Sequence, residues 1–144
     1  MYKEDFIDSA YFQHKDVKFI FGIDSKNHLI DDRSGLMLFE YIDSGEGFYT
    51  IDFKRIKYKK DDAVFIKPWQ HVSITPTSPT KRIFLAYTPH IDDGISKYME
   101  NDQVRKKANC KEPLFNLFEF LQDKEMCIDS ITFLFLNSIS DCIE

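Results

Sequence analysis

His71 is the side chain whose surroundings first suggest metal chemistry, because it follows Pro68-Trp69-Gln70 at the end of an apolar run. An open metal centre built on neighbouring strands takes several ligands, such as a His-x-His pair, a Glu and a later His. The apolar segment at residues 36–40 contains no histidine pair, and His28 stands alone. We therefore predict no metal site. We interpret His71 as a strand-end residue that forms a hydrogen bond or contacts a ligand.

The sequence contains no recognisable nucleophile or phosphate-binding motif. Gly-x-Ser-x-Gly, the Walker loop and His-Glu-x-x-His are all absent. Asp61-Asp62 and Asp92-Asp93 are adjacent carboxylates in expected turns, and neighbours on a strand point to opposite faces, so they suit acid–base catalysis poorly. We predict no catalytic residue, no cofactor and no enzymatic activity.

Several polar and aromatic side chains are candidates for binding a small molecule. Trp69 lies at a bend after Pro68, where a tryptophan either packs as a lid or contacts a ligand. A cation near the ends of neighbouring strands can hold a carboxylate or phosphate, although a solvated position is commoner. The aromatic content of 15% favours an apolar ligand, such as a fatty acid, more than it favours a sugar. The predicted ligand-binding residues are Tyr41, Lys67, Trp69, His71 and Arg82.

Short segments rich in β-branched and aromatic residues predict the strands that would position these side chains. Tyr49, Ile51 and Phe53 alternate with polar residues and are expected on one face of a strand. The predicted strands are residues 17–23, 36–42, 48–58 with a hairpin near Lys54-Arg55, 63–66, 71–75 and 81–88, with 28–30 as a short edge strand.

Beyond Pro89 the pattern changes to apolar residues at three- and four-residue spacing, which predicts two amphipathic helices. Pro113 suits the first turn of the earlier one, and residues 95–106 are expected to form a shorter helix. A second subunit could cover the apolar stripes, although the helices could also bury each other or be covered by a downstream region. The predicted homodimer interface is Leu114, Leu117, Phe118, Leu121, Ile128, Ile131 and Phe135.

Bulk composition limits the kind of partner. The 144 residues carry a net charge of −5, which argues against nucleic-acid binding by this chain alone. The three cysteines, Cys110, Cys127 and Cys142, show no Cys-x-x-Cys pairing and are expected to be reduced and mostly buried, as in a cytoplasmic protein. The longest apolar run is far shorter than the ~20 residues that span a bilayer, so no membrane association is expected.

The segment from Gly45 to Thr88 resembles the N-terminal sensing domain of AraC-family transcription regulators. The similarity lies in Gly45-Glu46-Gly47-Phe48-Tyr49 and in the run from Lys59 to His71, in which Asp62, an apolar stretch, Pro68 and His71 match the family pattern. The resemblance implies a mainly β, cupin-like double-stranded barrel (jelly roll) at residues 1–90, followed by an α-helical dimerisation segment at 91–144. It also implies a small-molecule effector and a DNA-binding region that this sequence does not match. The alternative is a stand-alone small-barrel enzyme, such as a metal-dependent isomerase or dioxygenase.

Overall fold

A computed structural model of the chain describes residues 9–13, 19–24, 37–87, 104–105, 108, 110–121, 126 and 128–140. The elements are β1 (Ser9–Gln13), β2 (Phe19–Asp24), β3 (Met37–Ser44), β4 (Gly47–Ile51), β5 (Lys54–Tyr58), β6 (Ala63–Ile66), β7 (Val72–Pro76), β8 (Lys81–Tyr87), β9 (Val104–Arg105), α1 (Lys111–Leu121) and α2 (Ile128–Ser140). The predicted edge strand at 28–30 lies outside the described residues.

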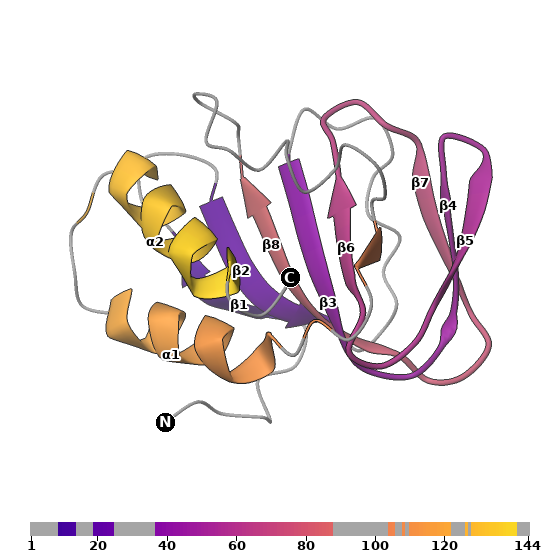
Figure 1. The fold of residues 1–144 in the computed structure, drawn as a ribbon, viewed down its shortest axis with the longest axis horizontal. Helices are drawn as coiled ribbons and strands as arrows, with labels where there is room; N and C mark the ends of the chain where they lie inside the picture. Colours follow the sequence, from indigo (N-terminus) through magenta and orange to yellow (C-terminus); the bar gives the residue numbers. More distant parts are fainter. Residues whose placement is uncertain are drawn as a thin grey trace.

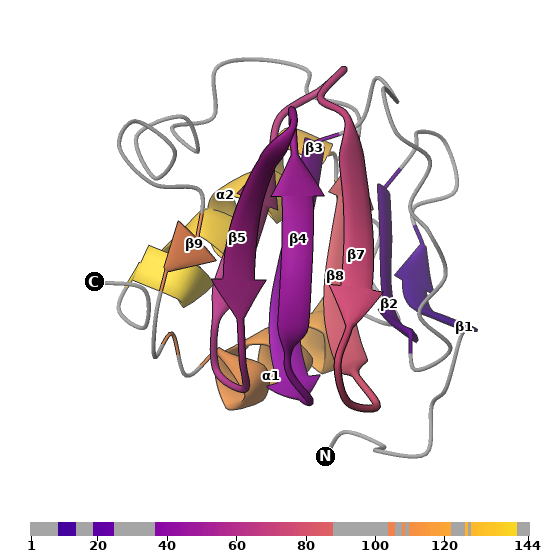
Figure 2. The ribbon, with the colours of Figure 1, turned by 90° about the vertical axis from the view of Figure 1, so that its right-hand side faces the viewer.

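The strands form two antiparallel sheets that face each other, and both helices lie on the outer side of the larger sheet (Figure 1). The six-stranded sheet has the order β1-β2-β8-β3-β6-β9, and the three-stranded sheet has the order β5-β4-β7. Figure 2 looks onto the smaller sheet from outside, with β4 between its two neighbours. From β5 to β8 successive strands alternate between the sheets, which is the order of a jelly roll. The predicted fold class, a mainly β, cupin-like jelly roll followed by C-terminal helices, is confirmed.

Strand β3 separates two hydrophobic cores, because successive side chains of a strand point to opposite faces. Leu38 and Ile42 point between the two sheets and pack with Tyr49 of the smaller sheet. Phe39 and Tyr41 point to the other face and pack with residues of the helices. Six consecutive residues of β3 are therefore buried, as in a strand covered on both faces.

The β4–β5 hairpin turns at Asp52-Phe53, two residues before the predicted position. Ile51 pairs with Lys54, so the loop has two residues, and both have positive φ angles of 49° and 68°. Two positive φ values are typical of a type I′ hairpin turn. Phe53 therefore leaves the alternation of the strand and is 87% exposed, which corrects the expectation that it shares a face with Tyr49 and Ile51.

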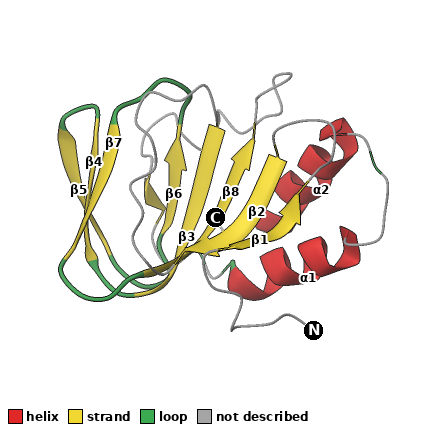
Figure 3. Cartoon of the chain, turned by 180° about the vertical axis from the view of Figure 1, so that it is seen from behind, coloured by secondary structure: helices red, strands yellow, loops and turns green. Residues whose placement is uncertain are grey.

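Helices α1 and α2 close the outer face of the larger sheet (Figure 3). The prediction of two amphipathic helices is confirmed, with Pro113 in the first turn of α1. The expected helix at residues 95–106 is wrong at Val104–Arg105, which pair with β6 as strand β9, and its other residues lie outside the described part. No helix among the described residues is long and apolar enough to cross a membrane.

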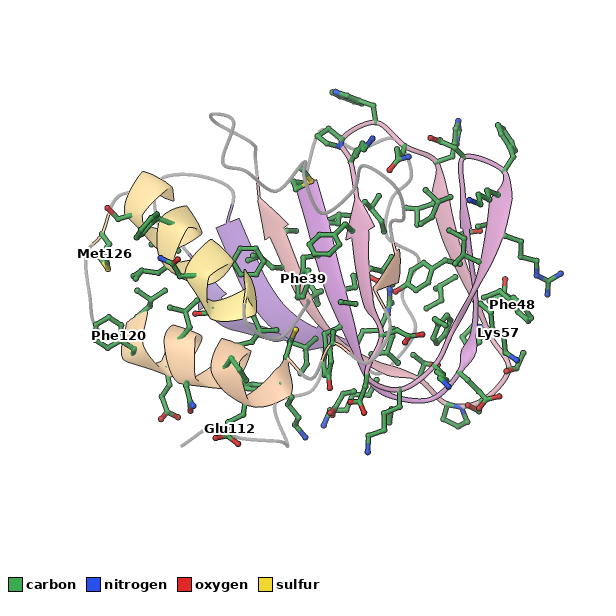
Figure 4. All side chains as sticks on the ribbon, viewed as in Figure 1. Phe39, Phe48, Lys57, Glu112, Phe120 and Met126 are labelled. Atoms are coloured by element: carbon green, nitrogen blue, oxygen red, sulfur yellow. The ribbon has the colours of Figure 1, made fainter. Side chains whose placement is uncertain are left out.

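The predicted dimer-interface residues lie largely inside the chain's own core. Figure 4 shows Phe39 on the side of the sheet that faces the helices. The predicted interface residues that are buried with it are Leu114, Leu117, Leu121, Ile131 and Phe135. The side chains of Phe118 and Ile128 are outside the described set. Because the five buried side chains already pack against the sheet, a partner subunit cannot reach them. Their assignment to an interface is corrected to a role in the core.

Candidate functional site

The five predicted ligand-binding residues lie in three different places. Tyr41 belongs to the core between the larger sheet and the helices. Arg82 is buried between the two sheets, where only 1% of its surface is exposed. Lys67, Trp69 and His71 lie in the connection between β6 and β7. The structure therefore does not assemble them into one site.

The β6–β7 connection is fastened to the β4–β5 turn through Asp52. The carboxylate of Asp52 accepts the main-chain N–H of His71 and the side-chain amide of Gln70, each at 2.9 Å. The His71 N–H lowers the pKa of Asp52, followed by the bond from Gln70. Trp69 has a positive φ of 69° and is 68% exposed. These contacts join two turns at one end of the sheets.

His71 is placed in this connection and not within a metal centre. Its ring lies 5.6 Å from the ring of Phe53, measured between centroids. Among the residues that the structure describes, no group of three or more His, Cys, Asp or Glu side chains could hold a metal ion.

A buried ionic cluster lies between the two sheets, and the sequence predicted only one of its members. Nη1 of Arg82 is 3.1 Å from Oε1 of Glu40, and both side chains are almost fully buried. The hydroxyl of Tyr49 donates a short hydrogen bond to the same oxygen. Burial and the Glu40 carboxylate raise the pKa of Tyr49 well above its usual value. Tyr49 therefore stays protonated and acts as a donor.

Strand register explains why Glu40 and Arg82 meet. Ile42 is the partner of Arg82 across the β3–β8 pair, so Glu40, two residues away, is its diagonal neighbour on the same face. Strand alternation alone would have placed both charges on the inner face. The signal was present in the sequence, as one acidic residue in a run of apolar residues and one basic residue in a neighbouring strand.

The space around this pair is filled by large side chains. Tyr58 is completely buried, and its hydroxyl is 2.8 Å from Oγ1 of Thr80. The rings of Tyr49 and Tyr58 meet edge to face, with centroids 5.2 Å apart. Glu40 and Arg82 both belong to the larger sheet, and the Tyr49–Glu40 hydrogen bond connects them to the smaller one. One carboxylate oxygen of Glu40, Oε2, is buried without a hydrogen-bond partner among the described residues.

A polar cleft of about 560 Å³ opens on the other side of β3, between the larger sheet and the start of α1. The sheet side contributes residues of β3 and of the β5–β6 turn, and the helix side contributes the first two turns of α1. Of the predicted ligand-binding residues, only Tyr41 lines this cleft. The lining residues are Tyr41, Asp43, Lys60, Asp61, Lys111, Glu112, Pro113 and Asn116.

One ion pair connects the two sides of the cleft, and a second ion pair and a hydrogen bond lie on its sheet side. Asp43 on β3 lies 3.2 Å from Nζ of Lys111 on α1 and 3.6 Å from Nζ of Lys81 on β8. The hydroxyl of Tyr41 donates a short hydrogen bond to the carboxylate of Asp61. Burial, together with this bond, raises the pKa of Tyr41 far above its usual value. Tyr41 is therefore a hydrogen-bond donor at any physiological pH.

Asp61 is the residue at which the sheet and the helical part of the chain meet. Its N–H donates to the carbonyl of Ile42 at 2.8 Å, and its carbonyl accepts the N–H of Ala108 at 2.6 Å. Its φ is +72°, a left-handed conformation that aspartate tolerates better than most residues. Nearby, the thiol of Cys110 is buried and contacts the carbonyl of Ala108 at 3.5 Å. This agrees with a reduced, buried thiol.

The class of fold is thus a jelly roll of two antiparallel sheets with helices on one outer face. No protein-family model matches the chain, and no curated protein matches it. Among solved structures, the cupin domain of Cnp3 from Schizosaccharomyces pombe is similar, with 13% identity and a TM-score of 0.49 over 65% of this chain and 71% of that domain.

Two further solved structures are also similar to this chain. The EutQ protein of Clostridium difficile has 15% identity and a TM-score of 0.41, and the match covers 49% of this chain and 52% of EutQ. The nucleoside dehydratase Pac13 has 11% identity and a TM-score of 0.44, with 55% and 66% covered. A second similar structure, of a Pac13 variant with uridine, names Streptomyces as the source.

Proposed function

We propose that the chain is the effector-sensing domain of an AraC-type transcription regulator in the cytoplasm, and that the effector binds in the cleft between the larger sheet and α1. The observation that carries this proposal is the composition of the cleft wall. Four lining residues come from β3 and the β5–β6 turn, and four come from α1. A ligand in the cleft touches both parts of the molecule at once.

This position gives a mechanism for sensing. A ligand changes the equilibrium between two arrangements only if it binds them with different affinity. A molecule held between Asp61 and α1 favours the arrangement in which both walls are at contact distance. The position of α1 relative to the sheet then depends on the effector. The AraC-type resemblance supplies the output, a DNA-binding region that follows the helical segment.

Dimerisation belongs to the same proposal, with a different surface from the one predicted. Phe120 at the end of α1, labelled in Figure 4, is 54% exposed, and Phe133 on α2 is 64% exposed. Both are large apolar side chains on the helices. We assign the homodimer contact to these two residues because the remaining apolar residues with described side chains on α1 and α2 are buried or half-buried.

Hydrogen exchange in the presence of a metabolite panel tests the sensing proposal. A true effector should slow amide exchange in the first turns of α1 and raise the melting temperature. Asn116→Arg places a large side chain in the cleft and should abolish both effects. Asn137→Arg makes the same change at an exposed position of α2 and should leave both intact. Equal loss in the two variants, or protection confined to the β6–β7 connection, would contradict the proposal.

A stand-alone small-barrel enzyme is the second candidate, and Glu40 is the observation that favours it. Its buried Oε2, which has no hydrogen-bond partner in the described part of the chain, is a possible metal ligand or proton acceptor. Native mass spectrometry separates the two candidates. A metal-free dimer that retains a small molecule supports the sensor. One equivalent of metal that disappears in Glu40→Gln supports the enzyme.

A further inference from the structure

The charged groups of the cleft are not all neutralised by one another. Asp43 lies between the ammonium groups of Lys111 and Lys81, so the charge of this carboxylate is already neutralised within the chain. Lys60 and Glu112 also line the cleft, and neither forms an ion pair with another described residue. Within the described part of the chain, the cleft therefore contains one ammonium and one carboxylate without an ion pair, beside the Asp61 carboxylate that accepts the Tyr41 hydroxyl.

Lys60 lies on the sheet side of the cleft and Glu112 on the helix side, and each has a polar neighbour that could also bind a ligand. Lys60 precedes Asp61 in the β5–β6 turn, where the hydroxyl of Tyr41 fixes the Asp61 carboxylate. Glu112 and Asn116 are four residues apart on α1, so they share one face of the helix. Figure 4 shows Glu112 at the start of α1. Carboxylates from both walls can thus surround a cation, and the amide can bond to either end of a ligand.

The lining excludes three simpler ligand classes. A fatty acid needs an apolar wall, but Pro113 is the one lining residue without a polar side chain. This replaces the expectation of an apolar effector that the aromatic content suggested. A phosphate or other simple anion would be repelled by the carboxylates of Asp61 and Glu112. A simple cation would be repelled by Lys60.

We propose that the ligand of this cleft is a small zwitterion, a free amino acid or a short peptide. The inference rests on the proposed sensing function. The carboxylate of the ligand pairs with Lys60, and its ammonium group pairs with Asp61 and Glu112. The volume of about 560 Å³ lies within the range of about 300–1,000 Å³ that is usual for ligand sites. It leaves room for a side chain beyond the two charged groups.

Thermal shift measurements with three matched sets of compounds test the ligand class. The sets are free α-amino acids, the same amino acids with N-acetyl groups, and the same amino acids as amides. The two blocked sets each lack one of the charges. At about a hundred times its Kd, a true ligand should raise the melting temperature by several degrees. The blocked forms should bind at least tenfold more weakly, because each leaves a charge of the cleft without its partner.

Variants then test the location. Lys60→Met should weaken binding of the free amino acid at least tenfold and leave binding of its amide, which lacks the carboxylate, unchanged. Glu112→Gln should show the reverse selectivity and spare the N-acetyl form. Lys57→Met, an exposed position on β5, is the control and should bind like the unmodified chain.

The outcomes separate this inference from the function on which it rests. If another class of compound binds and Asn116→Arg abolishes that binding, the sensing cleft stands and the zwitterion is wrong. If blocked and free amino acids bind equally, the zwitterion is also wrong. If free amino acids bind but neither Lys60→Met nor Glu112→Gln weakens them, the location is overturned. If no compound of the panel or the three sets binds, both proposals fail.

Discussion

Removal of Arg82 is expected to destabilise the chain strongly. Arg82 neutralises the buried carboxylate of Glu40 at 3.1 Å. The variant Arg82→Met leaves that charge in the interior without its partner, and breaking a buried pair in this way costs about 3–5 kcal/mol. For a domain of this size about 1 kcal/mol corresponds to roughly 3 °C, so the melting temperature should fall by about 10–15 °C.

Replacement of the whole cluster by apolar groups gives the opposite expectation. In Glu40→Met/Arg82→Met both charges are gone, but the hydroxyl of Tyr49 loses its acceptor, at a cost of about 1–3 kcal/mol. Adding Tyr49→Phe removes this last polar group. The triple variant should therefore lie within about 1 kcal/mol of the unmodified chain, or above it.

Urea unfolding at 25 °C, followed by circular dichroism, measures these free energies. The reasoning is refuted if Arg82→Met loses less than about 1 kcal/mol. It is equally refuted if the triple variant is as unstable as the single one, because the loss would then come from packing and not from an unpaired charge.

Three further changes test individual backbone and pH effects. Phe53→Gly should raise the free energy of unfolding by about 1 kcal/mol in urea, because glycine adopts the left-handed turn without the steric cost of a side chain that is mostly exposed. Gly47→Ala should lower it by about 1–3 kcal/mol, because a Cβ there would lie 2.4 Å from the carbonyl oxygen of Thr75; an unchanged melting curve would contradict this. Asp52→Asn should make the free energy of unfolding depend less steeply on pH in the acid range. The N–H of His71 lowers the folded-state pKa of Asp52, so the stabilisation is present above the ordinary pKa of 3.8 and is lost as pH falls through the folded value, which unfolding curves between about pH 2 and pH 6 would show.

The strands and helices could be predicted from the sequence because they follow from local patterns. The apolar stripe of α1 was recognised from the spacing of Leu114, Leu117 and Leu121. Periodicity shows which face of a helix is apolar but not what covers it. The stripe was therefore assigned to a partner subunit, whereas these residues pack against the chain's own sheet.

The candidate site was harder to predict because it depends on contacts between distant segments. Asp61 was expected only in a turn, and no local pattern indicated a binding role for Lys60 or Glu112. Their meeting in one cleft is set by strand β9 and by the Ala108 to Asp61 hydrogen bond, neither of which has a local signature. Glu40 differs, since strand alternation on β3 would have located it beside Arg82.

The double-sided burial of β3 has a consequence for production and folding of the protein. Residues 37–42 form an apolar, β-prone segment with Glu40 as the only charged residue, which is the kind of segment that aggregates when it is exposed. The outer side of this segment, with Phe39 and Tyr41, is covered by helices that are synthesised after the strands β1–β9. Until those helices pack against it, the larger sheet of the nascent chain exposes an apolar surface that favours aggregation. A fragment cut after β8 should therefore collect in inclusion bodies, and chaperone dependence should end once α2 is complete.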